Sequence, residues 1–104
     1  MNNTLEIKIQ DLKNLNKEEY LLVDIREEAA FAHGFIPDAV NIPLSKFREN
    51  PELLPKEKKI ILYCAKGILS YDAAEELAEK GYDAIHLAGG YGAWLLDSFS
   101  TEER

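Results

Sequence analysis

The only cysteine in the sequence, Cys64, is the residue best suited to covalent chemistry. It directly follows residues 60–63, a short apolar run led by β-branched residues that is typical of a strand buried on both faces. Residues 70–80 then show the apolar spacing of a helix, and Gly81 stands where helices commonly end. The sequence therefore predicts that Cys64 lies at the carboxyl end of a central strand, one short loop before a helix N-terminus.

This predicted position favours a reactive thiolate. Backbone N–H groups of a loop that enters a helix lack intrahelical partners, and the helix dipole adds partial positive charge there. Cysteines in such positions can have pKa values of about 3.5 to 7.5. The same N–H groups would hold a persulfide anion or an anionic substrate. A small buried hydrophobic residue is the alternative interpretation of a lone cysteine, but the position of Cys64 favours a nucleophile. The predicted binding loop consists of Ala65, Lys66, Gly67, Ile68, Leu69 and Ser70.

Length and composition limit the classes of protein that fit. A chain of 104 residues predicts a single domain, residues 1–104. Its net charge of −7 argues against a nucleic-acid partner, which requires clustered basic residues. No apolar run is long enough for a membrane span, and residues 1–4 begin no signal peptide, so we expect a cytoplasmic protein without membrane contacts. One cysteine and two histidines also argue against a structural metal site.

The remaining elements alternate between strands and helices along the chain. Strands are predicted over residues 5–9, 20–24, 40–42, 60–63 and 82–87, from their apolar alternation or apolar runs. Helical segments are predicted over residues 11–17, 26–33, 44–54, 70–80 and 91–98, with residues 101–104 as a frayed tail. Alternation at this density predicts an α/β fold with a mainly parallel sheet covered on both faces.

Three blocks of the sequence are similar to the signatures of one known family. The first comprises VDIRE at residues 23–27 and GFIPDAVNIP at residues 34–43. The second comprises Tyr63 and Cys64 with Gly67 and Ser70, followed by helix residues up to Leu77. The third comprises residues 81–82 and LAGGYGAW at residues 87–94. In this order and spacing, the blocks resemble the rhodanese-like (sulfurtransferase) domain family in its single-domain form, over nearly the whole chain.

The resemblance implies a fold, a reaction and partners. The fold would be a five-stranded, mainly parallel sheet with helices on both faces. Cys64 would be the catalytic nucleophile, carrying sulfane sulfur as a persulfide from a donor (a persulfide, polysulfide or thiosulfate) to a thiol or protein acceptor. No cofactor is implied, because the cysteine itself carries the sulfur. Asp24 and Arg26 are candidate supporting residues, and we interpret them as a structural pair near the end of the sheet rather than as catalytic acid and base.

The chain also departs from the family pattern around the nucleophile. Leu69 and Ala65 occupy loop positions where active members commonly have arginine, so Lys66 is the only cation in the loop. Lys66 either orients an anionic substrate or is a solvated surface residue. Phe35 and Ala30 replace a histidine and a glutamate that the family often has, which indicates apolar packing there. Because thiosulfate is a dianion and arginine binds such groups in bidentate fashion, we expect donors with less charge to be preferred.

Two other functions remain as alternatives. The missing arginine also fits a catalytically weak binding or regulatory module that has kept the fold. A cysteine-dependent phosphatase would need an arginine six positions after the cysteine, where this chain has Ser70, so a phosphoryl group would lack the guanidinium support that its transition state requires.

Four further side chains have predicted positions. Leu69 either packs beneath the following helix or belongs to an apolar lip where a partner protein docks. Packing is favoured, because Leu69 lies four residues before Ala73 on a helical face. Ile68 either packs inward or forms an apolar lip where a partner protein docks. His86 and Trp94 are interpreted as structural, the latter in or near the core.

Overall fold

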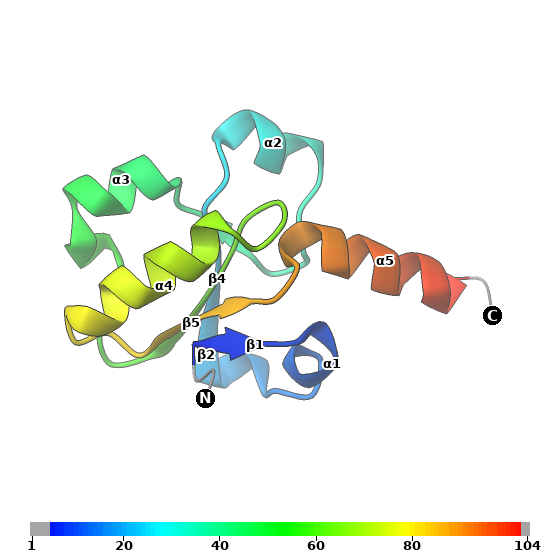
Figure 1. The fold of residues 1–104 in the computed structure, drawn as a ribbon, viewed down its shortest axis with the longest axis horizontal. Coiled ribbons are helices and arrows are strands. Elements are labelled where there is room, and N and C mark those ends of the chain that lie inside the picture. Colours follow the sequence, from blue (N-terminus) through cyan, green and yellow to red (C-terminus); the bar gives the residue numbers. More distant parts are fainter. Residues whose placement is uncertain (1–4, 103–104) are drawn as a thin grey trace.

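The computed structural model describes residues 5–102, which form a five-stranded sheet with helices around it (Figure 1). The strands are β1 (Glu6–Ile7), β2 (Tyr20–Asp24), β3 (Val40–Asn41), β4 (Lys59–Tyr63) and β5 (Ala84–Leu87). They lie in the order β1-β5-β4-β2-β3, and all four pairings between them are parallel. The predicted parallel α/β architecture is therefore confirmed.

Helices cover both faces of this sheet (Figure 1). They are α1 (Ile9–Leu12), α2 (Glu28–His33), α3 (Leu44–Glu49), α4 (Leu69–Glu79) and α5 (Gly90–Glu102), with 3-10 turns η1 (Lys17–Glu19) and η2 (Pro51–Leu53). One apolar core cluster lies between the sheet and α3 and α4, and the other between the sheet and α1 and α5. None of the helices among residues 5–102 is long and apolar enough to cross a bilayer.

Strand β4 is the middle strand of the sheet, and its side chains are buried on both faces. Ile60 and Leu62 belong to the core cluster on the α4 side, whereas Ile61 and Tyr63 belong to the cluster on the α1 and α5 side. This alternation follows from the two-residue period of a strand. Cys64, the next residue, has the parity of Ile60 and Leu62 and belongs to the cluster on the α4 side. The fold thus places the thiol at the carboxyl end of the central strand.

The two ends of the chain differ from the sequence prediction. The first strand stops at Ile7, and α1 begins at Ile9 rather than at residue 11, because the spacing of Ile9 and Leu12 lets one helical turn bury Leu12. At the other end, α5 continues to Glu102, because residues 95–102 contain neither glycine nor proline to end it. The predicted tail is therefore wrong for residues 101–102, and residues 103–104 lie outside the described part.

An ion pair fixes the chain where β2 ends. The Asp24 carboxylate is fully buried and accepts hydrogen bonds from the backbone N–H and the guanidinium of Arg26, with Nη2 2.7 Å from Oδ2. Arg26 Nη2 also donates to the carbonyl oxygen of Gly34 at 2.6 Å, and the guanidinium lies over the ring of Tyr91 in α5, 4.4 Å from its centre. Arg26 therefore joins β2, the segment after α2, and the first turn of α5.

The buried position of this pair predicts its contribution to stability. Replacing Arg26→Met leaves the Asp24 carboxylate buried without its partner, which should lower the free energy of unfolding by about 3–5 kcal/mol in urea denaturation. Adding Asp24→Asn should recover part of that loss, because the uncompensated charge is gone. The matched control is Arg48→Met, which breaks an ion pair with Glu76 whose side chains are 47% and 42% exposed; it should cost no more than about 1 kcal/mol. Equal losses for Arg26→Met and Arg48→Met would contradict the assignment.

Candidate active site

The Cys64 loop, residues 64–70, connects β4 to α4 and turns its backbone N–H groups toward the sulfur. Sγ of Cys64 accepts hydrogen bonds from the N–H groups of Gly67 at 3.2 Å and Ser70 at 3.4 Å. The hydroxyl oxygen of Ser70 also lies 3.4 Å from Sγ. The thiol is 5% exposed. The loop therefore surrounds the sulfur with donors that stabilise negative charge on it.

These contacts determine the charge state of the thiol. Burial alone raises the pKa of Cys64, because it disfavours the thiolate. Hydrogen bonds from the Ser70 hydroxyl and from the backbone N–H groups of Ser70, Gly67 and Lys66 act in the opposite direction and outweigh burial, so the pKa of Cys64 lies below its ordinary value. The arrangement therefore favours the nucleophilic thiolate more than the surroundings of an ordinary cysteine do.

The start of α5 holds this loop from behind. The N–H groups of Tyr91 and Gly92 donate to the carbonyl oxygens of Cys64 at 2.8 Å and Ala65 at 3.0 Å. The close approach requires glycine at two positions. A Cβ at Gly90 would collide with the Cys64 carbonyl oxygen, and a Cβ at Gly67 (φ +91°) would lie 2.8 Å from the backbone nitrogen of Gly89.

A pocket of about 400 Å³ opens beside the sulfur. It is lined by Ile25, Arg26, Glu27, Leu44, Cys64, Ala65, Lys66, Ile68 and Leu69. Arg26 is therefore at the wall of this pocket, with its guanidinium already held by Asp24. The structure brings Arg26 together with Ala65, Lys66, Ile68 and Leu69 around this pocket. The predicted loop residues Gly67 and Ser70 do not line it, nor does the buried Asp24.

The expectation that Leu69 packs inward is wrong. Its side chain is 57% exposed, and that of Ile68 is 70% exposed. The buried stripe of α4 consists of Ser70, Ala73, Ala74 and Leu77. Leu69 precedes the first residue of that stripe, and one residue turns a helix by about a quarter of a revolution, so its side chain points toward the pocket. Ile68 and Leu69 thus form an apolar lip, and Lys66 is exposed beside them.

His86, which the sequence alone indicated only as a structural strand residue, lies next to the site. It is 2% exposed, and its Nδ1 lies 2.9 Å from the hydroxyl oxygen of Ser70. Its Nε2 lies 3.2 Å from Oε1 of Glu6 in β1. The signal was present in the strand alternation, because residue 86 has the parity of Ala84, which faces the α4 side.

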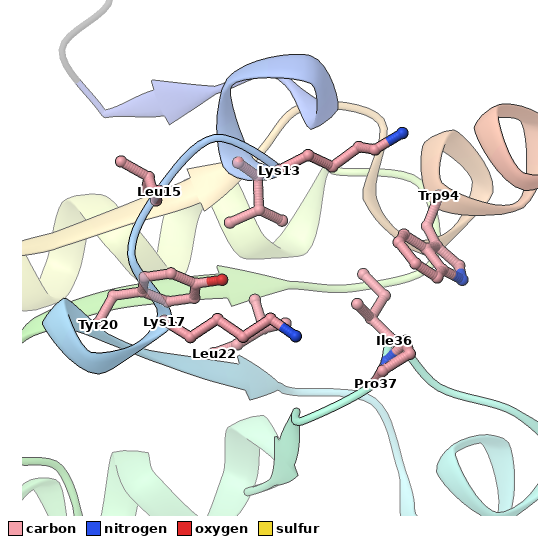
Figure 2. Close-up of a pocket in the computed structure, with 9 residues that line it drawn as sticks. Lys13, Leu15, Lys17, Tyr20, Leu22, Ile36, Pro37 and Trp94 are labelled. Carbon is pink, nitrogen blue, oxygen red and sulfur yellow. The ribbon is translucent and has the colours of Figure 1, made fainter.

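A second pocket, of about 280 Å³, lies on the other face of the sheet (Figure 2). Leu12, Leu22 and Ile36 line it, and Trp94 stands at one side, half-buried at the edge of the core. The rest of its wall consists of Lys13, Leu15, Lys17, Tyr20 and Pro37 (Figure 2). The described residues that line this pocket include no cysteine, serine or histidine. Of these two pockets, the one beside Cys64 combines a cavity with a nucleophile.

Comparison with known proteins agrees with this geometry. The family model described as rhodanese-like domain matches residues 9–97. The chain belongs to this family. A sulfurtransferase from Allochromatium vinosum is 40% identical over 78 residues, which cover 74% of this chain and 73% of the relative.

Two further relatives of this rhodanese-like domain extend the comparison. The thiosulfate sulfurtransferase GlpE of Coxiella burnetii is 30% identical over 81 residues, covering 77% of this chain and 76% of the relative. The crystal structure of a rhodanese-related protein from Thermoplasma volcanium matches with a TM-score of 0.82 and 33% identity, covering 88% of this chain and 91% of that one. The chain is therefore a member of a family of rhodanese-type sulfurtransferases.

The lowered pKa of Cys64 gives a pH-dependent prediction. The rate of alkylation by iodoacetamide follows the thiolate fraction, so its midpoint should lie below the ordinary value of about 8.5. Gly67→Ala should raise that midpoint, because its Cβ would push the donating N–H away from the sulfur. The control is Gly81→Ala, which has a similar backbone angle (φ +94°) but whose Cβ would come no closer than 3.8 Å to Lys56 Nζ. Identical midpoints in the two variants would show that the loop geometry does not set the pKa.

Proposed function

We propose that this protein is a sulfurtransferase in which Cys64 carries a sulfane sulfur atom as a persulfide. The observation that supports it is the combination of a thiol of lowered pKa, three hydrogen-bonding groups around its sulfur, and an adjacent pocket of about 400 Å³. The Cys64 thiolate attacks the outer sulfur of a donor R–S–S–H, a new S–S bond forms, and R–S⁻ leaves. An acceptor thiolate then attacks the outer sulfur of the Cys64 persulfide and releases the Cys64 thiolate.

The loop donors assist both half-reactions. In the first, they raise the fraction of Cys64 that is a nucleophilic thiolate. In the second, Cys64 is the leaving group, and a thiol of lower pKa leaves faster in exchange at sulfur. The N–H groups of Gly67 and Ser70 are held by the loop and need no rearrangement between the two steps. One fixed arrangement thus serves loading and unloading of sulfur.

The charges around the pocket favour donors other than thiosulfate. Arg26 is already paired with Asp24, and Glu27 adds a carboxylate to the same pocket wall. Lys66 adds one cation, and the neighbouring lip of Ile68 and Leu69 is apolar. A dianion such as thiosulfate would find little net positive charge there. A persulfide or polysulfide carries less charge for its size, and the apolar lip suits an organic or protein donor.

Loading of sulfur on Cys64 is the direct test of this function. After incubation with inorganic polysulfide, intact-protein mass spectrometry should show the mass of one added sulfur atom, removable by dithiothreitol. Cys64→Ser should show no addition and no transfer to a small thiol, with unchanged circular dichroism, because the change removes the nucleophile and little volume. Turnover by a folded Cys64→Ser protein at the wild-type rate would overturn the proposal and favour a binding module.

Donor preference gives a second prediction, on Leu69. Because this side chain is exposed at the pocket, Leu69→Arg should be tolerated and should add a cation for thiosulfate. A charge-assisted hydrogen bond contributes about 1.5–3 kcal/mol, so kcat/KM for transfer from thiosulfate to cyanide should rise on the order of ten- to a hundred-fold, and turnover of polysulfide much less. The control is Leu96→Arg, which adds the same charge at a side chain 70% exposed on α5. A folded Leu69→Arg protein without a selective gain on thiosulfate would show that charge does not limit this donor.

A further inference from the structure

A buried chain of polar side chains extends from Cys64 away from the pocket. Among the described residues, the buried polar or charged ones are Asp24, Ser70 and His86. Asp24 is paired with Arg26, whereas Ser70 and His86 bond to each other behind the cysteine. Neither of these two lines the pocket where a sulfur donor would enter. They can therefore act on the thiol without occupying the pocket.

The distances define a continuous path. It runs from Cys64 Sγ to Ser70 Oγ (3.4 Å), from Ser70 Oγ to His86 Nδ1 (2.9 Å), and from His86 Nε2 to Glu6 Oε1 (3.2 Å). A carboxylate oxygen accepts hydrogen bonds, so the contact with Glu6 assigns the proton of the neutral ring to Nε2. Nδ1 is then an acceptor for the Ser70 hydroxyl, and a lone pair of that hydroxyl is available to the Cys64 thiol. Every donor in the path thus has an acceptor.

We infer that His86 accepts, through Ser70, the proton that Cys64 releases when it becomes a nucleophile. The Cys64 S–H proton passes to Ser70 Oγ while the Ser70 O–H proton passes to His86 Nδ1. The products are a thiolate, a neutral serine and an imidazolium, and no electron changes hands. The Glu6 carboxylate stabilises the imidazolium at Nε2. This inference rests on the proposed function of Cys64, and it assigns to Ser70, His86 and Glu6 a positioning and proton-accepting role behind it.

The remaining charged and titratable groups lie to either side of this path. Tyr71 of α4 places its ring edge-on to the His86 ring, with the ring centres 5.4 Å apart. Arg26, Glu27 and Lys66 line the pocket on the other side of the sulfur. Glu6 is thus the carboxylate that bonds to His86, and Ser70 is the hydroxyl between His86 and the thiol. The path therefore has a defined direction, from Cys64 to His86.

The first test is a double-mutant cycle on alkylation of Cys64 by iodoacetamide. His86→Gln keeps a hydrogen-bond acceptor for Ser70 but cannot take up a proton, so it should raise the midpoint pH by about one unit. Ser70→Ala should also raise it. The double variant should shift no further than Ser70→Ala alone, because the path is already broken. Additive shifts, or a wild-type midpoint for folded His86→Gln, would overturn the inference.

The second test reads the proton on the histidine itself. The ¹⁵N-labelled wild-type protein is held at a constant pH at which the alkylation test shows Cys64 to be a thiolate, so that the inference expects His86 Nδ1 to be protonated. Carboxamidomethylation of Cys64 should then change the His86 Nδ1 resonance from protonated to unprotonated, because the thiolate is lost. In Ser70→Ala the same reaction should leave that resonance unchanged. His33, at the end of α2 and exposed, is the internal control and should not respond. An unresponsive His86 in wild-type protein would overturn the inference.

Both tests measure ionisation of the Cys64 thiol rather than sulfur transfer. Failure of this inference is therefore distinguishable from failure of polysulfide loading, which would contradict the proposed function.

Discussion

Two backbone hydrogen bonds from the first turn of α5 to the carbonyl oxygens of Cys64 and Ala65 hold the site together. A peptide group whose carbonyl is held on one side presents its N–H in a fixed direction on the other, because the peptide is planar. The two anchored peptides carry the N–H groups of Ala65 and Lys66 and fix the start of the loop. The residues that follow direct the N–H groups of Gly67 and Ser70 at one sulfur atom. Without this anchor, a short loop containing a glycine would have several backbone conformations open to it, and few of them would direct two N–H groups at the thiol.

The same turn of α5 also receives the end of β2. The Arg26 guanidinium lies over Tyr91, next to the residues that bond the Cys64 loop, and is held there by Asp24. Segments that follow three different strands thus meet at the carboxyl edge of the sheet, where open α/β sheets commonly bind ligands. Their contacts are backbone hydrogen bonds, a buried ion pair and a ring contact, which together leave little freedom in the position of the sulfur.

Much of this could be predicted from the sequence, because burial on both faces leaves a strong signal. The apolar run before Cys64 indicated the central strand, and the spacing of Ala73, Ala74 and Leu77 indicated the helix after it. Position along the chain then placed the thiol at the strand end. These inferences needed local periodicity alone, and the parallel architecture followed from the alternation of elements.

The parts that could not be predicted depend on tertiary contacts. Leu69 has helical spacing to Ala73, but the buried stripe begins at Ser70, and the exact phase of a helix is set by what packs against it. The sequence identifies His86 only as a strand residue. Its contact with Ser70 depends on the position of β5 beside β4 in the sheet. The hydrogen bonds from α5 to the Cys64 loop join residues far apart in the sequence through backbone atoms. In the sequence, only the glycines that permit this close approach could have indicated it.

The Cys64 loop has an inner surface that contacts the sulfur and an outer surface that is exposed. This separation affects which substitutions the protein can accept during evolution. Its inner surface is built from backbone N–H groups and Ser70, whereas Ala65, Lys66, Ile68 and Leu69 turn their side chains outward. Substitutions at the outer positions alter the shape and charge that a visiting molecule meets, and they leave the inner hydrogen bonds in place. Reactivity and selectivity are thereby encoded in separate atoms of one loop. Substitutions at these four exposed positions can therefore change which donors and acceptors bind, while the reaction at the Cys64 sulfur stays the same.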